Sequence, residues 1–531
     1  MCGIFAYLGI NFNKEELVKC LLMNKHRGPD NTKYLHIDNR LFMGFNRLQI
    51  NGIDEISNQP FCIGDYVLIC NGEIYNFKEL IEKYDLSEDY ISNSDCEIII
   101  HLYKKIGLIN MLNELDGVFS FVLHDKKENK TFIARDPIGI RSLYYSYSDR
   151  GFAVASEMKS LIPFEDVFQF PAGSYLEINE DNKNTLNINN YYELKTTKLE
   201  EDEEKITYNI KMLLTNAVEK RLMSDRPIGC LLSGGLDSTL VTSLVTRSNK
   251  TNGIKVNTYS IGLKGSIDLK YAKIASEYLG TNHTNIELSE NEFLDAIEKT
   301  IYQIESWDVT TVRASVGNYL VSLYIKENSE DTVIFCGDVS DELFGSYRGF
   351  MNTNSYKDFL SENMRMIQDI RYFDVLRSDK SISGASLEAR VPFADKEFME
   401  YVMSIHPKYK MFNDKKIEKC ILRKAFIGYL PDELLWRRKE AFSDGVSSYQ
   451  RSWFDIIKEH VDKKYSQKEY NIMSSRYIYQ KPYDKESLYY REIFEKYYPN
   501  RAGTIPYYWK HPFTTEQDPS ARLLKCYTDD K

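Results

Sequence analysis

The sequence predicts a multidomain α/β protein, with antiparallel sheets covered by helices in its N-terminal part and a parallel sheet in its C-terminal part. Its 531 residues exceed what a single hydrophobic core supports. Short strand-like runs separated by turn signals fill the first third of the chain, whereas strands alternate with helical patterns after residue 206. A hydrophobic content of 43% with 27% charged residues is typical of globular domains.

The charge distribution argues against nucleic acid and membranes as partners. The net charge is −10, and the basic residues form no cluster that could follow a phosphate backbone. No apolar run reaches the length of a bilayer span, and the N-terminus lacks the pattern of a signal peptide. The nine cysteines form no C-x-x-C pair, so a zinc site is not indicated. We therefore expect a cytoplasmic protein that acts on small molecules.

The N-terminal part combines strands and helices in a pattern that predicts helices packed on antiparallel sheets. Strand-like runs cover residues 61–63, 66–70, 118–123 and 131–134, and apolar helical patterns cover residues 14–24 and 95–106. An Asn-, Lys- and Glu-rich stretch at residues 179–205 has few apolar residues and indicates a linker. We therefore place the first domain at residues 2–190.

Cys2 is the candidate nucleophile of this domain. Its side chain is small enough for the initiator methionine to be removed, which would leave a thiol and a free α-amine on one residue. The α-amine has an ordinary pKa of about 8 and can act as general base beside the thiol near neutral pH. A cysteine here is also compatible with a plain N-terminal strand, so the assignment depends on the segments that follow.

Five polar segments between the expected elements point to one family. They are His26-Arg27-Gly28-Pro29-Asp30, Asn46-Arg47-Leu48-Gln49-Ile50, Asn71-Gly72-Glu73-Ile74-Tyr75-Asn76, Ser94-Asp95-Cys96-Glu97 and Ala134-Arg135-Asp136-Pro137-Ile138-Gly139. Taken alone, Asn-Gly after a strand is a common hairpin turn. In this order after an N-terminal cysteine, the segments resemble the glutaminase domain of class II glutamine amidotransferases, which are N-terminal nucleophile (Ntn) hydrolases. The resemblance implies a four-layer αββα sandwich.

The resemblance also implies roles for the matching side chains. Cys2 would attack the side-chain amide of glutamine, giving a thioester and ammonia. The Asn71 side-chain amide and the Gly72 backbone N–H would form the oxyanion hole, where loss of one donor costs about 10²- to 10³-fold in rate. Because the α-amino-acid end of glutamine is zwitterionic, it needs a cation and an anion at fixed separation. The glutamine-binding residues implied are Arg47 for the carboxylate, Asp95 for the ammonium, Glu73, and again Asn71 and Gly72.

After the linker, the sequence predicts a second domain at residues 206–531 that contains a parallel sheet. A helix is expected at residues 206–223, strands at 228–232, 256–262, 284–288 and 332–336, and a further helix at 268–279. The carboxyl ends of parallel strands meet at one edge of a sheet, where ligands bind. We therefore expect Ser233, Ile261 and Gly337 to lie at that edge.

The stretch Ser233-Gly234-Gly235-Leu236-Asp237-Ser238 predicts an anion site between a strand and a helix. Two glycines allow a sharp turn and a close approach of the backbone to a ligand, and the N–H groups at the helix start attract an anion. No lysine follows the glycines, which excludes a Walker P-loop.

This stretch resembles the pyrophosphate loop of ATP pyrophosphatases, which split ATP between its α and β phosphates. The acidic turn from Gly337 to Glu342 predicts a second group at the same edge, with Asp341 and Asp237 as Mg²⁺ ligands beside the phosphates. The ATP-binding residues expected are Leu232, Ser233, Gly234, Gly235, Asp237, Ser238, Ile261 and Gly337.

Five further segments indicate which molecule accepts the adenylyl group. They are residues 307–315, 386–393 and 437–445 and the C-terminal motifs Pro506-Tyr507-Tyr508-Trp509 and Asp518-Pro519-Ser520-Ala521-Arg522. Together with both domains they resemble glutamine-hydrolysing asparagine synthetases, and the resemblance covers essentially the whole chain. It implies that aspartate attacks ATP to form β-aspartyl-AMP, that ammonia reaches this intermediate by a sheltered path, and that the enzyme is a homodimer.

The resemblance assigns three kinds of side chain in this domain. Thr310, Thr311 and Arg313 would position aspartate, since two hydroxyls and an arginine suffice to hold a carboxylate. Lys439 would neutralise charge on the phosphates in the transition state. Asp338 stands where the family carries glutamate, and Val339 replaces a glycine. If that acid takes a proton from ammonia, the shorter side chain would reach less well.

Two other interpretations are compatible with these patterns. One is an adenylating amidotransferase for a different acid, such as a β-lactam-forming relative. The other is a degenerate relative that serves as a storage or interaction module, which would show no ATP–pyrophosphate exchange.

Overall fold

The computed structural model describes residues 1–9, 13–38, 40–149, 151–179, 186–194, 199–250 and 255–520. They separate into two compact units: Met1–Leu194 with Met223–Pro227 and Ser383–Glu388, and Lys195–Leu222 with Ile228–Ile382 and Ala389–Lys531. The expected linker at 179–205 lies partly outside the described residues, as do Ala521 and Arg522 of the C-terminal motif. The boundaries 2–190 and 206–531 stay predictions.

The first unit contains two six-stranded antiparallel sheets. Their strand orders are β10-β8-β9-β1-β3-β2 and β12-β11-β7-β6-β5-β4. The strands are β1 (Gly3–Gly9), β2 (Asn31–Ile37), β3 (Leu41–Arg47), β4 (Phe61–Ile63), β5 (Tyr66–Ile74), β6 (Gly117–Asp125), β7 (Lys130–Arg135), β8 (Tyr144–Ser148), β9 (Gly151–Ala155), β10 (Val167–Gln169), β11 (Ser174–Asn179) and β12 (Ile188–Asn190). The helices are α1 (Lys14–Leu22), α2 (Phe77–Tyr84) and α3 (Ile98–Glu114), with short 3₁₀ turns at Lys25–Arg27, Asp95–Glu97 and Met158–Leu161.

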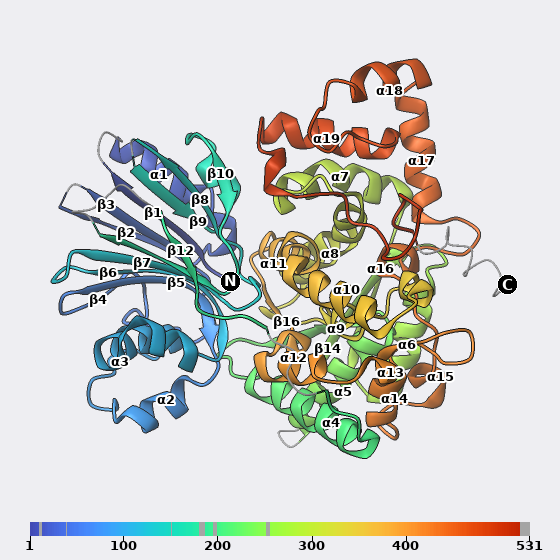
Figure 1. Ribbon diagram of the computed structural model, residues 1–531, viewed down its shortest axis with the longest axis horizontal. Coiled ribbons are helices and arrows are strands. Elements are labelled where there is room, and N and C mark those ends of the chain that lie inside the picture. The colour runs from blue at the N-terminus through green and yellow to red at the C-terminus, as the bar shows by residue number, and fades with distance from the viewer. Residues whose placement is uncertain are drawn as a thin grey trace. The chain divides into compact units, whose positions relative to one another are not determined.

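The two sheets face each other and helices cover their outer faces, which confirms the αββα expectation. Ile4 and Phe45 of one sheet share a fully apolar core with Val67 and Val122 of the other. On the opposite face of the second sheet, residues of α3 such as Ile99 pack on that sheet in a separate core. Figure 1 shows α1 and the pair α2 and α3 on opposite sides of the two sheets.

One local expectation in this unit needs correction. The helix expected at residues 95–106 begins with a 3₁₀ turn, because the Ser94 side chain accepts a hydrogen bond from the Cys96 N–H, and α3 then continues to Glu114 across a break at Gly107. Asn71-Gly72, a pair that alone would favour a hairpin turn, lies within β5 and pairs with β6. The hydrogen bonds of the sheet therefore outweigh the local turn preference of Asn-Gly.

The second unit is organised around the five-stranded sheet β15-β14-β13-β16-β17. Its strands are β13 (Ile228–Leu231), β14 (Asn257–Leu263), β15 (Asn282–Leu288), β16 (Val333–Phe335) and β17 (Glu388–Arg390). β13 is parallel to β14 and to β16, and β14 is parallel to β15. The parallel sheet expected from the sequence is thus confirmed.

Helices surround this sheet and supply most of the second unit. The longer ones are α4 (Glu203–Lys220), α5 (Leu236–Lys250), α6 (Ile267–Leu279), α7 (Glu290–Ile304), α8 (Val309–Asn328), α10 (Tyr356–Asp369), α11 (Asp374–Ser383), α12 (Lys396–Met403), α17 (Trp453–Lys464), α18 (Gln467–Ser474) and α19 (Lys485–Tyr497). The shorter ones are α9 (Ser340–Phe344), α13 (Pro407–Lys410), α14 (Cys420–Ala425), α15 (Asp432–Leu435) and α16 (Phe442–Gly445), with 3₁₀ turns at Arg348–Asn352, Ile370–Tyr372, Pro392–Ala394 and Ala502–Thr504.

The first helix of this unit begins earlier than expected. α4 starts at Glu203 rather than residue 206, because the Asp202 side chain accepts a hydrogen bond from the Lys205 N–H and caps it. Within the described ranges, no helix combines the length and apolar character needed to cross a bilayer.

Candidate functional site

The first candidate site surrounds Cys2, directly before β1. The Cys2 backbone N–H donates a 2.9 Å hydrogen bond to Asn71 Oδ1, and the Cys2 carbonyl accepts one of 2.8 Å from Arg27 Nε. Its Sγ accepts a hydrogen bond from the Leu48 N–H at 3.4 Å. Burial raises the pKa of the Cys2 thiol to about 11. The thiol therefore needs a base at neutral pH.

Asn71 lies on β5, and its two side-chain atoms play different parts. Oδ1 accepts the bond from Cys2, whereas Nδ2 is buried and has no hydrogen-bond partner among the described residues. A buried donor without a partner costs free energy and is expected where a ligand supplies the acceptor. Nδ2 of Asn71 is thus available beside the nucleophile to an oxyanion.

Gly72 follows Asn71 in β5 and lies close to the backbone of the neighbouring strand β6. A Cβ at this position would lie 2.5 Å from the Val118 carbonyl oxygen, so only glycine fits. The Gly72 backbone N–H, the expected second donor of the oxyanion hole, is therefore not shielded by a side chain of its own residue.

The side chains expected to hold the amino-acid end of glutamine are buried and fixed. Arg47 Nη1 donates to the Asp54 carbonyl at 2.9 Å and to Asn58 Oδ1 at 2.8 Å. Asp95 Oδ2 accepts a 2.6 Å bond from the Ile74 N–H. Glu73 accepts a hydrogen bond from Asn51 Nδ2. Because these side chains are already held in place, they could bind the zwitterionic end of an amino acid without changing their conformation.

Sequence reasoning gave no role to two further groups, one that contacts Cys2 and one that contacts the loop holding Arg47. Arg27, in the His-Arg-Gly-Pro-Asp segment, forms a buried 2.6 Å ion pair with Glu157 in addition to holding the Cys2 carbonyl. Asp225 accepts a 2.8 Å hydrogen bond from the Gly52 N–H, in the loop that holds Arg47. The motif around Arg27 was a signal for its role, whereas nothing in the sequence around Asp225 indicates this contact.

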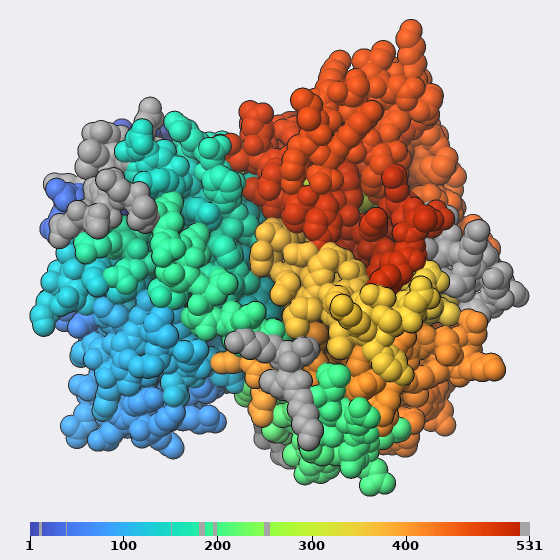
Figure 2. Space-filling view, in the orientation of Figure 1, coloured from blue at the N-terminus to red at the C-terminus, as the bar shows by residue number. Residues whose placement is uncertain are grey.

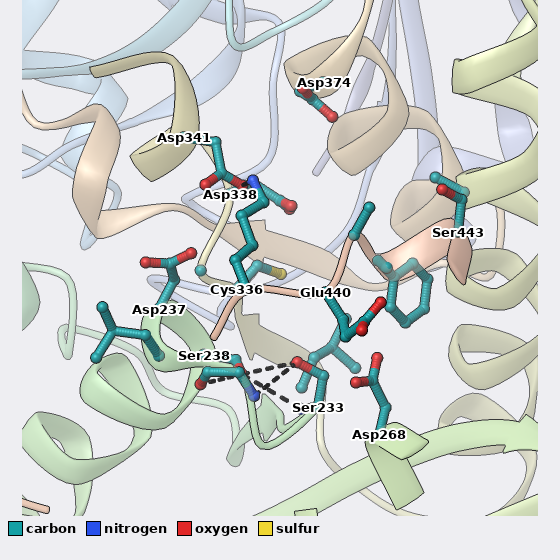
Figure 3. Close-up of a pocket in the computed structure, with 18 of the residues that line it drawn as sticks. Ser233, Asp237, Ser238, Asp268, Cys336, Asp338, Asp341, Asp374, Glu440 and Ser443 are labelled. Carbon is teal, nitrogen blue, oxygen red and sulfur yellow. Dashed lines mark hydrogen bonds and ion pairs between the residues drawn. The ribbon is translucent and has the colours of Figure 1, made fainter. Parts of the chain in front are cut away.

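The second candidate site is a pocket at the carboxyl edge of the parallel sheet, around the turn between β13 and α5 (Figure 3). The Ser233 and Ser238 hydroxyls lie 3.0 Å apart, and the Gly235 N–H donates to Ser233 Oγ at 3.3 Å. Gly234 has φ +71°, and a Cβ there would lie 2.3 Å from the Tyr271 backbone. Hydroxyls and N–H groups thus meet at the start of a helix, which is a suitable site for an anion.

The acidic turn lies beside this anion site, and two lysines pair with its carboxylates. Lys419 Nζ is 2.6 Å from Asp237 Oδ2 and 2.5 Å from Asp341 Oδ1. Lys439 Nζ is 2.5 Å from Asp341 Oδ2. Although burial opposes it, the charges of the two lysines hold the pKa of Asp341 well below its usual range. Asp341 is therefore an anion at neutral pH.

This arrangement permits a test of whether the site suits Mg²⁺. Asp237 and Asp341 are oxygen ligands of the kind that Mg²⁺ prefers, and both contact the same nitrogen atom, so they converge on one cation position. Lys419 occupies that position, and Lys439 covers the other oxygen of Asp341. The donor set fits a divalent cation provided that the lysines turn to another anion, such as a phosphate.

Asp338 lies in the same pocket but its carboxylate is held by neighbouring side chains. Oδ1 accepts a 2.7 Å bond from Arg377 Nη2, and Oδ2 accepts a bond from the Ser378 hydroxyl. Arg377 also bonds Asp374 at 2.9 Å. Val339, next to Asp338, has φ +79°, a conformation that β-branched residues rarely adopt. Asp338 and Val339 both differ from the family pattern. The first carries a carboxylate that neighbouring side chains hold in place, and the second has a strained backbone.

The three residues expected to bind aspartate are separated by the structure. Thr310 lines the pocket, and its hydroxyl is buried without a hydrogen-bond partner among the described residues. Thr311 instead donates from its N–H and its hydroxyl to Asp308, the residue that caps α8, at 2.9 and 2.8 Å. Arg313 bonds Glu486 and Asp518. Among the described residues that line the pocket, Thr311 and Arg313 do not occur.

The structure brings most of the other expected residues to this one pocket. The expected residues that line it are Leu232, Ser233, Gly235, Asp237, Ser238, Ile261, Gly337, Asp338, Asp341 and Lys439. Gly234 is in the turn itself, and its carbonyl accepts a 2.9 Å bond from Arg437. Sequence reasoning missed Lys419, in the turn before α14, and Arg377, in α11. Arg437 belongs to the segment 437–445 that the sequence did single out.

Comparison with known proteins places both units in one family. The chain matches the family models for a glutamine amidotransferase domain at residues 1–170 and for asparagine synthase at residues 209–365 and 351–521. It is 38% identical over 564 residues to the glutamine-hydrolysing asparagine synthetase of Gallus gallus, and the match covers 99% of each chain. It is 36% identical over 562 residues to the Homo sapiens enzyme, again with 99% of each chain covered. The chain therefore belongs to the family of glutamine-hydrolysing asparagine synthetases.

Proposed function

We propose that this protein converts L-aspartate to L-asparagine with ATP, using ammonia from the hydrolysis of L-glutamine and releasing L-glutamate, AMP and pyrophosphate. The observation that carries the proposal is the set of Ser233, Ser238, Asp237, Lys419 and Asp341 at one helix start, which can hold a pyrophosphate leaving group. Family similarity over the whole chain supports the coupling to glutamine.

In the glutaminase half, Cys2 supplies both nucleophile and base. Once Met1 is removed, the free α-amine takes the thiol proton, and the thiolate attacks the glutamine side-chain carbonyl. Asn71 Nδ2 and the Gly72 N–H stabilise the oxyanion of the tetrahedral intermediate. As the intermediate collapses, its amide nitrogen takes a proton from the α-ammonium, the C–N bond breaks and ammonia leaves; water then hydrolyses the thioester to glutamate and restores the Cys2 thiol.

The same half must also bind the α-carboxylate and α-ammonium groups of glutamine. We assign Arg47 to the α-carboxylate and Asp95 to the α-ammonium, with Glu73 close to the oxyanion hole. The bonds from Arg47 Nη1 to Asn58 Oδ1 and from the Ile74 N–H to Asp95 support this assignment, because they fix both groups before glutamine binds.

In the synthetase half, a side-chain oxygen of aspartate attacks the α-phosphorus of ATP, and the bond to pyrophosphate breaks. Leu232, Gly337 and Ile261 line the pocket that would receive the nucleotide, with the serine turn at its phosphates. Lys439 and Lys419 can each move from a carboxylate to a phosphate oxygen as negative charge builds there. We infer that Asp237 and Asp341 then hold Mg²⁺, which when bound would neutralise the leaving pyrophosphate.

In the last step, ammonia attacks the carbonyl carbon of β-aspartyl-AMP and AMP leaves. The attacking nitrogen must lose a proton, and Asp338 is the proposed acceptor. Arg377 and Ser378 already bond both of its oxygens, so the Asp338 carboxylate must give up one of these bonds before it can take the proton. We therefore expect amidation rather than adenylation to limit turnover.

Of the residues assigned to aspartate, Thr310 has the most direct support. Its buried hydroxyl lines the pocket and has no partner within the described ranges, so a substrate carboxylate can accept its hydrogen bond.

We also propose a homodimer, which size-exclusion chromatography with light scattering would test. A cytoplasmic location is proposed because Cys2 must stay reduced to act as nucleophile.

The decisive experiment supplies purified protein with ATP, Mg²⁺ and aspartate and follows asparagine and pyrophosphate. Wild-type protein should use glutamine or ammonium as nitrogen source, and Cys2→Ala should use only ammonium. A protein that hydrolyses glutamine but never releases pyrophosphate is not a synthetase. Release of pyrophosphate with a different carboxylic acid, and not with aspartate, would instead identify an amidotransferase for that acid.

A further inference from the structure

The last described segment of the chain, Ile505–Ser520, crosses the second unit as an extended strap rather than as helix or strand. Figure 2 shows this red segment at the surface of the second unit, beside the yellow residues that include α10. Two of its contacts are backbone contacts: the Phe513 carbonyl accepts a 3.2 Å bond from Asn352 Nδ2, and a Cβ at Gly349 would lie 2.0 Å from the Pro512 carbonyl oxygen. We call it the C-terminal strap.

Arg313 on α8 binds the C-terminal strap with its guanidinium fork. Nη1 and Nη2 donate to Asp518 at 3.1 and 2.8 Å, while Nε and Nη2 donate to Glu486 at 2.7 and 2.6 Å. The Arg313 side chain is only 2% exposed. Two bidentate carboxylate contacts use the whole donor edge of the fork, which leaves little of it for a substrate.

The C-terminal strap in turn contacts the segment that carries Lys439. Asp518 Oδ1 accepts a 2.8 Å bond from the Ser520 N–H, and Ser520 Oγ donates to Asp444 Oδ1 at 2.9 Å. Asp444 belongs to α16, which begins at Phe442, shortly after Lys439, and Lys439, Phe442 and Ser443 all line the pocket. A continuous chain of contacts therefore runs from Arg313 to the wall of the pocket.

The C-terminal strap also contacts two other parts of the same wall. The Trp509 N–H donates a 2.7 Å bond to Asp308, the residue that caps α8 just before Thr310. The Trp509 ring lies 4.9 Å from the Tyr347 ring, and Lys439 Nζ lies 4.3 Å from the centre of the Tyr347 ring. The strap thus supports Thr310, Tyr347 and Lys439 together.

We propose that Arg313 is a positioning residue of the synthetase site, which acts by fixing the C-terminal strap through Asp518 and not by binding aspartate. This inference depends on the proposed adenylation of aspartate in the same pocket. Side chains that must be placed within fractions of an ångström for phosphoryl chemistry need such support, because a misplacement of about 1 Å can cost about 10²-fold in rate.

The test uses the full-length protein and three substitutions along this chain of contacts: Arg313→Lys, Asp518→Ala and Ser520→Ala. Each is assayed for aspartate-dependent ATP–pyrophosphate exchange over a range of aspartate concentrations. Arg313→Lys and Asp518→Ala should lower kcat for exchange about tenfold or more. Ser520→Ala should lower it less, and none should raise KM for aspartate more than about threefold, since uniform substrate binding is not lost.

The combined variant Arg313→Lys/Asp518→Ala distinguishes a shared role from two separate ones. If both residues act through the strap, the double variant should lose about as much exchange as the worse single variant. Glutamine hydrolysis at Cys2 and the melting temperature report whether each variant is folded. Glu290→Ala, which removes a bidentate ion pair with the half-exposed Arg451, is the matched control for loss of such a pair and should leave exchange unchanged.

One result would overturn the proposal. If Arg313→Lys raises KM for aspartate tenfold or more while Asp518→Ala and Ser520→Ala leave both kcat and KM unchanged, Arg313 binds the substrate. Absence of exchange in the wild-type protein would be a different failure, since it would contradict the proposed function itself.

Discussion

The backbone nitrogen of Cys2 lies 2.9 Å from Oδ1 of Asn71, so the residue expected to stabilise the oxyanion also orients the atom that would become the catalytic base. With Met1 present, that nitrogen is an amide and cannot accept a proton. The Met1 amino group lies elsewhere, 3.2 Å from Glu388, and is buried.

Protein that retains Met1 should therefore lack glutaminase activity. We expect the rate to fall about 10²- to 10⁴-fold relative to protein that begins at Cys2, because the general base is missing. Intact-mass spectrometry would quantify the two forms in one preparation, and glutamate release would be measured for each. Ammonium-dependent synthesis should be equal in both, and equal glutaminase rates would show that the α-amine is not the base.

Substitutions at Asn71 should separate its donor from its acceptor. Asn71→Asp keeps an oxygen for the Cys2 nitrogen but loses the Nδ2 donor, and Asn71→Ala loses both. Either should lower kcat for glutamine hydrolysis about 10²-fold or more, with little change in KM. An aspartate variant as active as wild type would show that Nδ2 does not contact the oxyanion.

Removal of Lys419 should raise the affinity of the free protein for Mg²⁺ while abolishing adenylation. Lys419 lies between Asp237 and Asp341, where it competes with any cation for the same oxygens. In Lys419→Gln, both carboxylates lose that cation, and Mg²⁺ should bind at least about tenfold more tightly, since one charge at contact distance is worth several kcal/mol. Calorimetric titration with Mg²⁺ in the absence of ATP would measure this.

The matched variant for this titration is Asp341→Asn, which keeps Lys419 and should bind Mg²⁺ more weakly than wild type. If Lys419→Gln and wild type bind Mg²⁺ equally, the two carboxylates are not the cation site. Glutamine hydrolysis should be the same in all three proteins, because the proposed nucleophile for it is Cys2, in the other unit.

The strain at Val339 should reverse the usual order of stability, in which an alanine variant is more stable than a glycine variant. Both Val339→Ala and Val339→Gly lose the two γ-methyl groups, and the glycine variant also loses Cβ, so a glycine variant that is as stable as the alanine variant reports strain in the backbone. At φ +79° glycine should be at least as stable as alanine, by up to about 1 kcal/mol, since the left-handed region costs an L-residue about 1–2 kcal/mol.

Val245 in the middle of α5 provides the control for this comparison. It is also buried but helical, so Val245→Gly should be about 1 kcal/mol less stable than Val245→Ala. Denaturant unfolding of the four variants would show the reversal. The same order at both positions would mean that Val339 is not strained.

Local sequence patterns predicted the parts of the site that are continuous in the chain. An apolar run followed by Ser-Gly-Gly and an apolar helical period was enough to predict the turn between β13 and α5. Asn71-Gly72 was harder, because its strand conformation depends on pairing with β6, which no local signal specifies.

Contacts between distant segments were beyond such patterns. Lys419 is 182 residues from Asp237 and lies in an unremarkable charged stretch, so only the fold reveals that it bridges the two carboxylates. For Arg313 the sequence indicated the right chemistry, since its context predicted that it binds a carboxylate. The carboxylates it contacts belong to the chain itself, and one of them is 205 residues away.

His511 should make the second unit lose stability at mildly acidic pH. Burial, with the nearby charge of Lys439, lowers the pKa of His511 to about 4. Its Nε2 bonds the Pro519 carbonyl at 2.9 Å, while Nδ1 is buried with no hydrogen-bond partner in the described part of the chain, so a proton there would be unsatisfied. The unfolded chain binds this proton near pH 6.5, and therefore stability is lost as pH falls from about 6.5 toward 4, by at most about 3 kcal/mol.

Because His511 belongs to the C-terminal strap, this loss should reach the synthetase site before the rest of the molecule. ATP–pyrophosphate exchange should fall between pH 6.5 and 5, and His511→Asn, which cannot take up the proton, should flatten both the exchange profile and the dependence of melting temperature on pH. His36→Asn, at an exposed position on β2, is the control and should leave both profiles as they are in wild type. If His511→Asn leaves the acid limb of both profiles unchanged, another group controls the acid sensitivity of the strap.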